Sequence, residues 1–160
     1  MKLWKFTPNL FRMEFSRKGL RSLQIYSKPK TNFTQPKNHF AQTLKIQLEK
    51  YFNRQRVNFS IPIDWTGIPN FTRKVLSAVK RIPYGEVWSY QMIAHRIGKP
   101  KSSRAIGQAL ARNPMPIVIP CHRVIRSNHS LGGFSFGKKW KKRLLELEGW
   151  KVVKGKLKGE

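Results

Sequence analysis

The sequence predicts an α/β protein: a small amino-terminal α/β domain (1–60), a connection (61–70) and a mainly helical domain with a helix-turn-helix (71–150). Three observations lead to this prediction. Apolar residues follow a helical period before residue 53, proline and glycine interrupt the connection, and short helical segments joined by tight turns follow it. The 160 residues are 39% hydrophobic, enough for one or two domains with real cores. A basic tail (151–160) is expected to fray.

The amino-terminal domain is predicted from one helical segment and the apolar stretches before it. Phe40, Leu44, Leu48 and Phe52 recur every four residues, as one face of a helix over 39–52 requires. The shorter apolar stretches, such as Leu20 to Tyr26, are typical of strands, which gives a unit of strands followed by a helix.

The second domain is predicted to begin with a helix that ends at Pro83-Tyr84-Gly85. Ser89 can cap a second helix that stops at Gly98. After the turn at Lys99-Pro100, Ser102 or Ser103 can cap a third helix, Arg104 to Arg112. Two short helices joined by a tight turn outline a helix-turn-helix, although any helical hairpin looks similar. A last helix is expected from Lys138 to Leu147, closed by Gly149.

Charge is the strongest feature of the composition. The chain has 33 Lys and Arg against 7 Asp and Glu, a formal net charge of +26 spread over its whole length. Such a body repels itself, so a polyanionic partner is expected, and nucleic acid is favoured. The alternative is a lysine-rich surface of the heat-adapted kind, but there glutamate is enriched as well and here it is scarce. With no membrane-length apolar run and no signal peptide, a cytoplasmic protein is expected.

The only cysteine, Cys121, lies in a stiff segment with three prolines, Asn113 to Val124. A single cysteine excludes an intramolecular disulfide and a cysteine-rich zinc site, so no metal is expected. A lone cysteine is most often a small buried hydrophobe, but this one precedes a base, His122, and a cation, Arg123. Full ionisation of an unperturbed thiol would raise its reactivity at most about 30-fold, near 2 kcal/mol, so positioning matters more.

Cys121 and His122 would point to opposite faces of a strand, so their communication needs a bend or an intervening water. A carboxylate should orient the imidazole. Five acidic residues follow Ser60: Asp64, Glu86, Glu146, Glu148 and Glu160.

Five motifs together resemble one known family. They are Tyr84-Gly85-Glu86-Val87-Trp88-Ser89-Tyr90, Arg104-Ala105-Ile106-Gly107-Gln108-Ala109-Leu110 with Asn113-Pro114, Pro120-Cys121-His122-Arg123-Val124, Gly132-Gly133-Phe134-Ser135, and Leu144-Leu145-Glu146-Leu147-Glu148-Gly149. In this order they resemble the O6-alkylguanine-DNA alkyltransferases, or methylated-DNA–protein-cysteine methyltransferases. The resemblance covers about 69–150 and implies a winged-helix-like second domain.

The resemblance implies the catalytic roles. Cys121 matches the nucleophile that takes the alkyl group once, and His122 matches the residue that removes the thiol proton through a water. Glu148 matches the orienting carboxylate, with Glu146 the weaker choice and a solvated helix end the alternative. Tyr90 matches the residue that protonates the departing guanine and helps to evert it. Asn113 matches the asparagine whose side chain connects the DNA-binding helix to the active-site segment. The alternative is an ordinary helix-ending residue.

The resemblance also implies how DNA is held. Arg104 matches the arginine that fills the gap left by the everted guanine, which offsets part of the cost of extrusion. The helix that carries it, with Ser103, Ala105 and Gly107, would approach the minor groove. Close packing of Gly107 against another helix is the competing explanation. Leu110, Pro116, Phe134 and Ser135 match residues that form the walls of the guanine pocket. Phe134 stands in a place that often holds tyrosine.

Three hypotheses follow. The first is single-turnover repair of O6-alkylguanine, and also O4-alkylthymine, in double-stranded DNA, by a protein that needs no cofactor and is a monomer without DNA. The second is an alkyltransferase-like protein that only binds the lesion; such relatives lack the cysteine. The third is a helix-turn-helix regulator with an incidental cysteine, which would bind DNA without regard to lesions.

Overall fold

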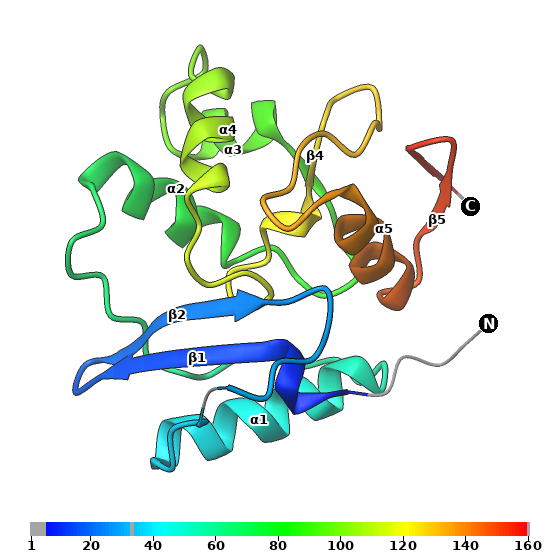
Figure 1. The fold of residues 1–160 in the computed structure, drawn as a ribbon. Helices are drawn as coiled ribbons and strands as arrows, with labels where there is room; N and C mark the ends of the chain where they lie inside the picture. The colour runs from blue at the N-terminus through cyan, green and yellow to red at the C-terminus, as the bar shows by residue number, and fades with distance from the viewer. Residues whose placement is uncertain (1–5, 33, 160) are drawn as a thin grey trace. The chain divides into compact units, whose positions relative to one another are not determined.

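The computed structural model describes residues 6–32 and 34–159 and contains two compact units, Met1–Thr66 and Gly67–Glu160 (Figure 1). The coarse prediction is confirmed, because helices combine with several small sheets. Within the described residues, no helix has the length and apolar character needed to cross a bilayer.

The first unit is a strand hairpin with one long helix. A 3-10 turn, Pro8–Leu10, leads into β1 (Phe11–Ser16), which pairs antiparallel with β2 (Gly19–Ile25). The helix α1 (His39–Phe52) starts where the Asn38 side chain accepts a hydrogen bond from the Ala41 amide. As its four-residue period predicts, Leu44, Leu48 and Phe52 are buried.

The first unit extends past the boundary expected at residue 60. Leu20 pairs with Ile63, and the Asp64 amide donates to the Leu20 carbonyl, so this part of the expected connection is joined to β2. Gly19 makes the approach possible, because a Cβ there would lie 2.1 Å from the Pro62 carbonyl oxygen.

The second unit opens with three packed helices. They are α2 (Asn70–Val79), α3 (Tyr90–Arg96) and α4 (Ser103–Ala111), which contact one another pairwise around buried Val75, Ile93 and Ile106. Ser89 caps α3 as expected, accepting from the Met92 amide at 3.1 Å. Ser102 precedes α4 but does not cap it with its side chain, since its hydroxyl donates to the Lys99 carbonyl instead.

The rest of the second unit holds the segment with the cysteine. β3 (Trp88–Ser89) pairs in parallel with β4 (Val124–Ile125), directly after the 3-10 turn Cys121–Arg123. This pairing brings the start of α3 beside the chain that follows Cys121. The last helix, α5 (Lys138–Leu147), has the predicted bounds.

The prediction of a frayed tail was wrong. Residues 151–158 form an antiparallel hairpin of β5 (Lys151–Val153) and β6 (Lys156–Lys158). Val152 and Leu157 alternate with exposed lysines and are buried with Leu145 of α5. In each strand one buried apolar residue alternates with exposed lysines, a pattern too short to stand out in a basic segment. The packing of these apolar residues holds the hairpin in place.

Candidate active site

The segment before Cys121 is a compact turn that holds the thiol in a fixed place. The Ile119 amide donates to the Met115 carbonyl, and the Cys121 amide donates to the Ile119 carbonyl at 2.8 Å. Ile117 has a φ of +71°, an uncommon conformation for a β-branched residue, which the surrounding turn imposes. Cys121 is only 7% exposed and starts a 3-10 turn, which supplies the bend between it and His122.

Asn113 connects the end of α4 to this turn. Its side-chain amide donates to the Ile119 carbonyl at 3.0 Å and to the Cys121 Sγ at 3.2 Å. Its Oδ1 accepts from the Met115 amide at 3.0 Å. One buried side chain therefore fixes both ends of the turn and contacts the sulfur directly.

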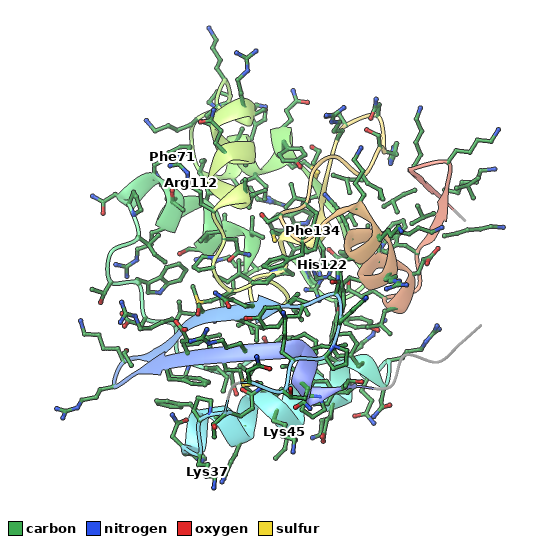
Figure 2. All side chains as sticks on the ribbon, in the orientation of Figure 1. Lys37, Lys45, Phe71, Arg112, His122 and Phe134 are labelled. Atoms are coloured by element: carbon green, nitrogen blue, oxygen red, sulfur yellow. The ribbon has the colours of Figure 1, made fainter. Side chains whose placement is uncertain are left out.

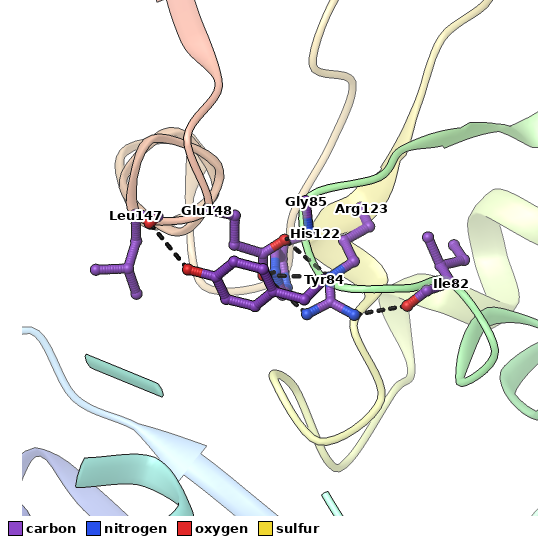
Figure 3. A network of polar contacts seen from close by, with 7 residues as sticks. All are labelled: Ile82, Tyr84, Gly85, His122, Arg123, Leu147 and Glu148. Atoms are coloured by element: carbon purple, nitrogen blue, oxygen red, sulfur yellow. Dashed lines mark hydrogen bonds and ion pairs between the residues drawn. The ribbon is translucent and has the colours of Figure 1, made fainter. Parts of the chain in front are cut away.

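Behind the cysteine lies a buried network centred on Glu148 (Figure 3). Glu148 Oε1 lies 2.7 Å from His122 Nε2, and Arg123 donates to both carboxylate oxygens, with Nε 2.9 Å from Oε2 and Nη2 2.9 Å from Oε1. Arg123 also donates to the Ile82 carbonyl, and the Gly85 amide donates to Glu148. The carboxylate is thus held by donors on several sides.

The network determines which nitrogen of His122 is basic. Burial alone would raise the pKa of Glu148, but His122 and Arg123 outweigh it and lower that pKa to about 2. Burial also lowers the pKa of His122, against the attraction of Glu148, so the neutral ring is favoured. An ionised Glu148 accepts a hydrogen bond from Nε2–H, which leaves the lone pair of the neutral imidazole on Nδ1.

A buried lysine of α5 lies near the thiol. Lys141 is fully buried, and its Nζ donates to the carbonyls of Val124 at 2.6 Å and Gly133 at 3.1 Å. Burial lowers its pKa to about 8, and the charge of Cys121 opposes that shift. Burial raises the pKa of Cys121, whereas the Asn113 hydrogen bond and the charge of Lys141 lower it.

In front of Cys121 is an open cavity of about 740 Å³. Its lining includes Cys121 and seven of the residues predicted from the sequence: Tyr90, Ser103, Arg104, Gly107, Leu110, Phe134 and Ser135. Ala105 is exposed on α4, and Pro116 is buried in the turn; neither is among the lining residues. The Ser135 hydroxyl donates to the Ala111 carbonyl and so joins the loop before α5 to the end of α4.

The loop before α5 supplies an aromatic wall of the cavity. Phe134, labelled in Figure 2, packs edge-on against Phe136. The two ring centroids are 5.8 Å apart. A Cβ at Gly132, whose φ is +71°, would lie 2.9 Å from the Tyr90 hydroxyl. Only glycine therefore allows this loop to pass so close to Tyr90. Burial raises the pKa of the Tyr90 hydroxyl, against the charge of Arg126.

Comparison with known proteins agrees with this geometry. The family model "6-O-methylguanine DNA methyltransferase, DNA binding domain" matches residues 70–150. The methylated-DNA–protein-cysteine methyltransferase of Archaeoglobus fulgidus is 41% identical over 137 residues, which cover 82% of this chain and 88% of that protein. The chain belongs to the 6-O-methylguanine DNA methyltransferase family.

Two further relatives show how far the family likeness extends. The constitutive enzyme of that name from Bacillus subtilis is 50% identical over 94 residues, which cover 59% of this chain and 56% of that protein. The crystal structure of Mycobacterium tuberculosis OGT in complex with DNA has a TM-score of 0.72 and 34% identity, with 86% of this chain and 91% of that chain covered. The likeness to OGT therefore reaches beyond the matched DNA-binding domain.

Three residues of the site were not predicted from the sequence: Lys141, Arg126 and Gly132. Lys141 follows Trp140 and lies four residues before Leu145, so the apolar period of α5 could have indicated its burial. Arg126 and Gly132 lie in an irregular loop with no periodic signal. Glu146, the weaker carboxylate, is half-exposed and lies 3.8 Å from Lys142, whereas His122 pairs with Glu148.

Proposed function

We propose that this chain repairs DNA by direct reversal, as a methylated-DNA–protein-cysteine methyltransferase. The Cys121 thiol would remove the alkyl group from O6 of guanine in double-stranded DNA. The observation that carries the proposal is a cysteine on the wall of an open cavity, with a buried His122–Glu148 pair behind it. Family membership supports the same activity. We keep O4-alkylthymine as a second substrate and the cytoplasm as the expected location.

The chemistry is a single displacement. Cys121 Sγ attacks the alkyl carbon, a C–S bond forms and the bond from carbon to O6 breaks. The thiol proton passes through a water to the basic Nδ1 of His122, and the Tyr90 hydroxyl protonates the departing guanine. Because a thioether is not a leaving group, the protein is consumed in one turnover. No metal or cofactor is needed for any of these steps.

Binding would use α3 and α4 as a helix-turn-helix in the minor groove. Arg104 is exposed and borders the cavity, where it can fill the stack after the guanine leaves. A Cβ at Gly107 would meet only a Tyr90 ring carbon, at an ordinary 3.9 Å. Helix packing therefore does not require glycine there, which supports close approach to DNA, together with Ser103 and Ala105.

The pocket would be walled by Leu110, Phe134 and Ser135, with Pro116 supporting the turn from inside. Phe134 can stack on the purine but offers no hydroxyl. This leaves the backbone amides around Ser135 as donors for O6, because the Ser135 hydroxyl already donates to the Ala111 carbonyl. The open cavity would accept alkyl groups larger than methyl.

The decisive experiment is intact-mass analysis after mixing the protein with a duplex that carries one O6-methylguanine. We expect a mass increase of one CH2 group, located on Cys121 by peptide mapping. Cys121→Ala should still bind the duplex and gain no mass. Binding of the lesion without mass gain by the native chain would favour the lesion-binding class, and binding indifferent to the lesion would favour a regulator.

A further inference from the structure

The carboxy-terminal hairpin is fixed to the loop that borders the active-site cavity. The Leu131 amide donates to the Gly155 carbonyl at 3.0 Å, and the Leu157 amide donates to the His129 carbonyl at 2.9 Å. Lys154 and Gly155 both have positive φ, as a two-residue hairpin turn needs. The lysines of the hairpin are thus presented by a defined structure.

A second cavity of about 430 Å³ lies between this hairpin, the loop and the start of α5. Arg126 and Gly133 line both cavities, so the two adjoin. Its cationic lining residues are Arg126, Lys138, Lys139 and Lys142, and none of its lining residues is acidic. One of these cations, Lys142, pairs with the half-exposed Glu146 at 3.8 Å.

The rim of this cavity carries further charge. Lys156 in β6 and Lys154 in the turn are exposed, as are Lys138 and Lys139. Exposed cations around a shared rim are groups that bind phosphate oxygens.

We infer that the hairpin and the start of α5 form a second DNA-binding surface, which holds the phosphate backbone of the duplex beside the lesion. This inference rests on the proposed function, because a strand whose nucleotide enters the first cavity must continue past its rim. Phosphate contacts of this kind add affinity and fix the position of the protein, and they read no sequence.

The test removes three lysines that take no part in the proposed chemistry. We compare Lys138→Gln/Lys139→Gln/Lys156→Gln with Lys37→Gln/Lys45→Gln/Lys50→Gln, in which three exposed lysines on or next to α1 are changed. Lys37 and Lys45 are labelled in Figure 2. Both variants lose the same charge. Affinity for an undamaged duplex is measured by fluorescence anisotropy between 50 and 200 mM salt.

For the native chain, each phosphate contact makes affinity fall about 3.5-fold over this salt range. If each of the three lysines contacts one phosphate, the factor by which salt lowers the affinity should be about 40-fold smaller for the first variant than for the native chain. The α1 variant should keep nearly the native salt dependence of affinity. Equal slopes for the two variants, or a native slope for the first, would overturn the inference.

A second readout separates this surface from the proposed chemistry. The first variant should take the methyl group from free O6-methylguanine base at the native rate, measured by intact mass. A slower reaction with the free base would mean that the substitutions damage the active site, and would count against the surface. If the native chain takes no methyl group from any donor, the proposed function fails while the affinity measurement still decides the inference.

Discussion

Lys141 is a cation in the interior whose position has a chemical consequence. Burying an ammonium group is costly, and two backbone carbonyls only partly replace its water. The compensation includes the thiol: a positive charge near Cys121 favours the thiolate that burial disfavours. Ionisation and positioning of the nucleophile are therefore linked through α5.

We expect Lys141→Met to raise the pKa of Cys121 and to slow alkyl transfer. Each unit of rise lowers the thiolate fraction tenfold near neutral pH, so a loss of about tenfold is expected. The pH dependence of thiol alkylation by iodoacetamide measures the pKa, and intact mass measures transfer. Lys142→Met, which changes the exposed neighbour, is the control, and transfer is measured from free O6-methylguanine base because Lys142 also lines the second cavity. An unchanged thiol pKa in Lys141→Met would contradict this role.

Glu148 links the site to acid stability. Its pKa is about 2 in the folded protein against 4.5 ordinarily, so its contribution is complete above pH 4.5 and is lost as the pH falls toward 2. That difference amounts to roughly 3 kcal/mol. In Glu148→Gln this part of the acid dependence should disappear, and Arg123 is left buried without its carboxylate, at a cost of about 3–5 kcal/mol.

Urea unfolding at pH 7 and at several acid pH values measures both effects for Glu148→Gln. The control is Glu146→Gln, whose exposed pair with Lys142 is worth under about 1 kcal/mol. A native acid dependence in Glu148→Gln would refute the assignment.

At the scale of elements, two adjacent glycines in the loop before α5 make a matched pair. Gly132 has positive φ and no room for a Cβ beside Tyr90, whereas a Cβ at Gly133 would meet nothing within 4 Å. Gly132→Ala should destabilise the fold by more than about 1 kcal/mol and slow transfer by displacing Tyr90. Gly133→Ala should be nearly neutral in thermal unfolding. Equal effects of the two changes would contradict the role of this close approach.

Gly107 in α4 should behave in the opposite way. Alanine is favoured over glycine within a helix by about 1 kcal/mol, and the structure has room for its Cβ. Gly107→Ala is expected to raise the melting temperature and to weaken duplex binding severalfold by holding α4 away from DNA. Gln108→Ala, on an exposed position, should leave binding unchanged. Native affinity in Gly107→Ala would argue against groove approach by this face.

The helices could be predicted because each depends on a local period. The bounds of α5 follow from its apolar face and Gly149, and Ser89 marks the start of α3. The hairpin of β5 and β6 could not, because its strands have three residues each and take their stability from contacts with α5. The same distinction holds in the site. Cys121 and His122 are adjacent in the sequence, whereas the charge of Arg126 acts on Tyr90 only because the fold brings the two residues together.

At the scale of the whole molecule, the net charge of +26 should give salt two opposite effects. Salt screens the repulsion among the basic residues, so the free protein should become more stable as ionic strength rises. Salt also removes the gain from counterion release, so duplex affinity should fall by about 10³-fold between 50 and 200 mM if six phosphates are contacted. Urea unfolding and fluorescence anisotropy over one sodium chloride series measure both. Self-repulsion and DNA binding come from the same charges, so both effects should appear together. If salt lowers the stability of the free protein, or leaves its duplex affinity unchanged, the net charge does not serve DNA binding in this way.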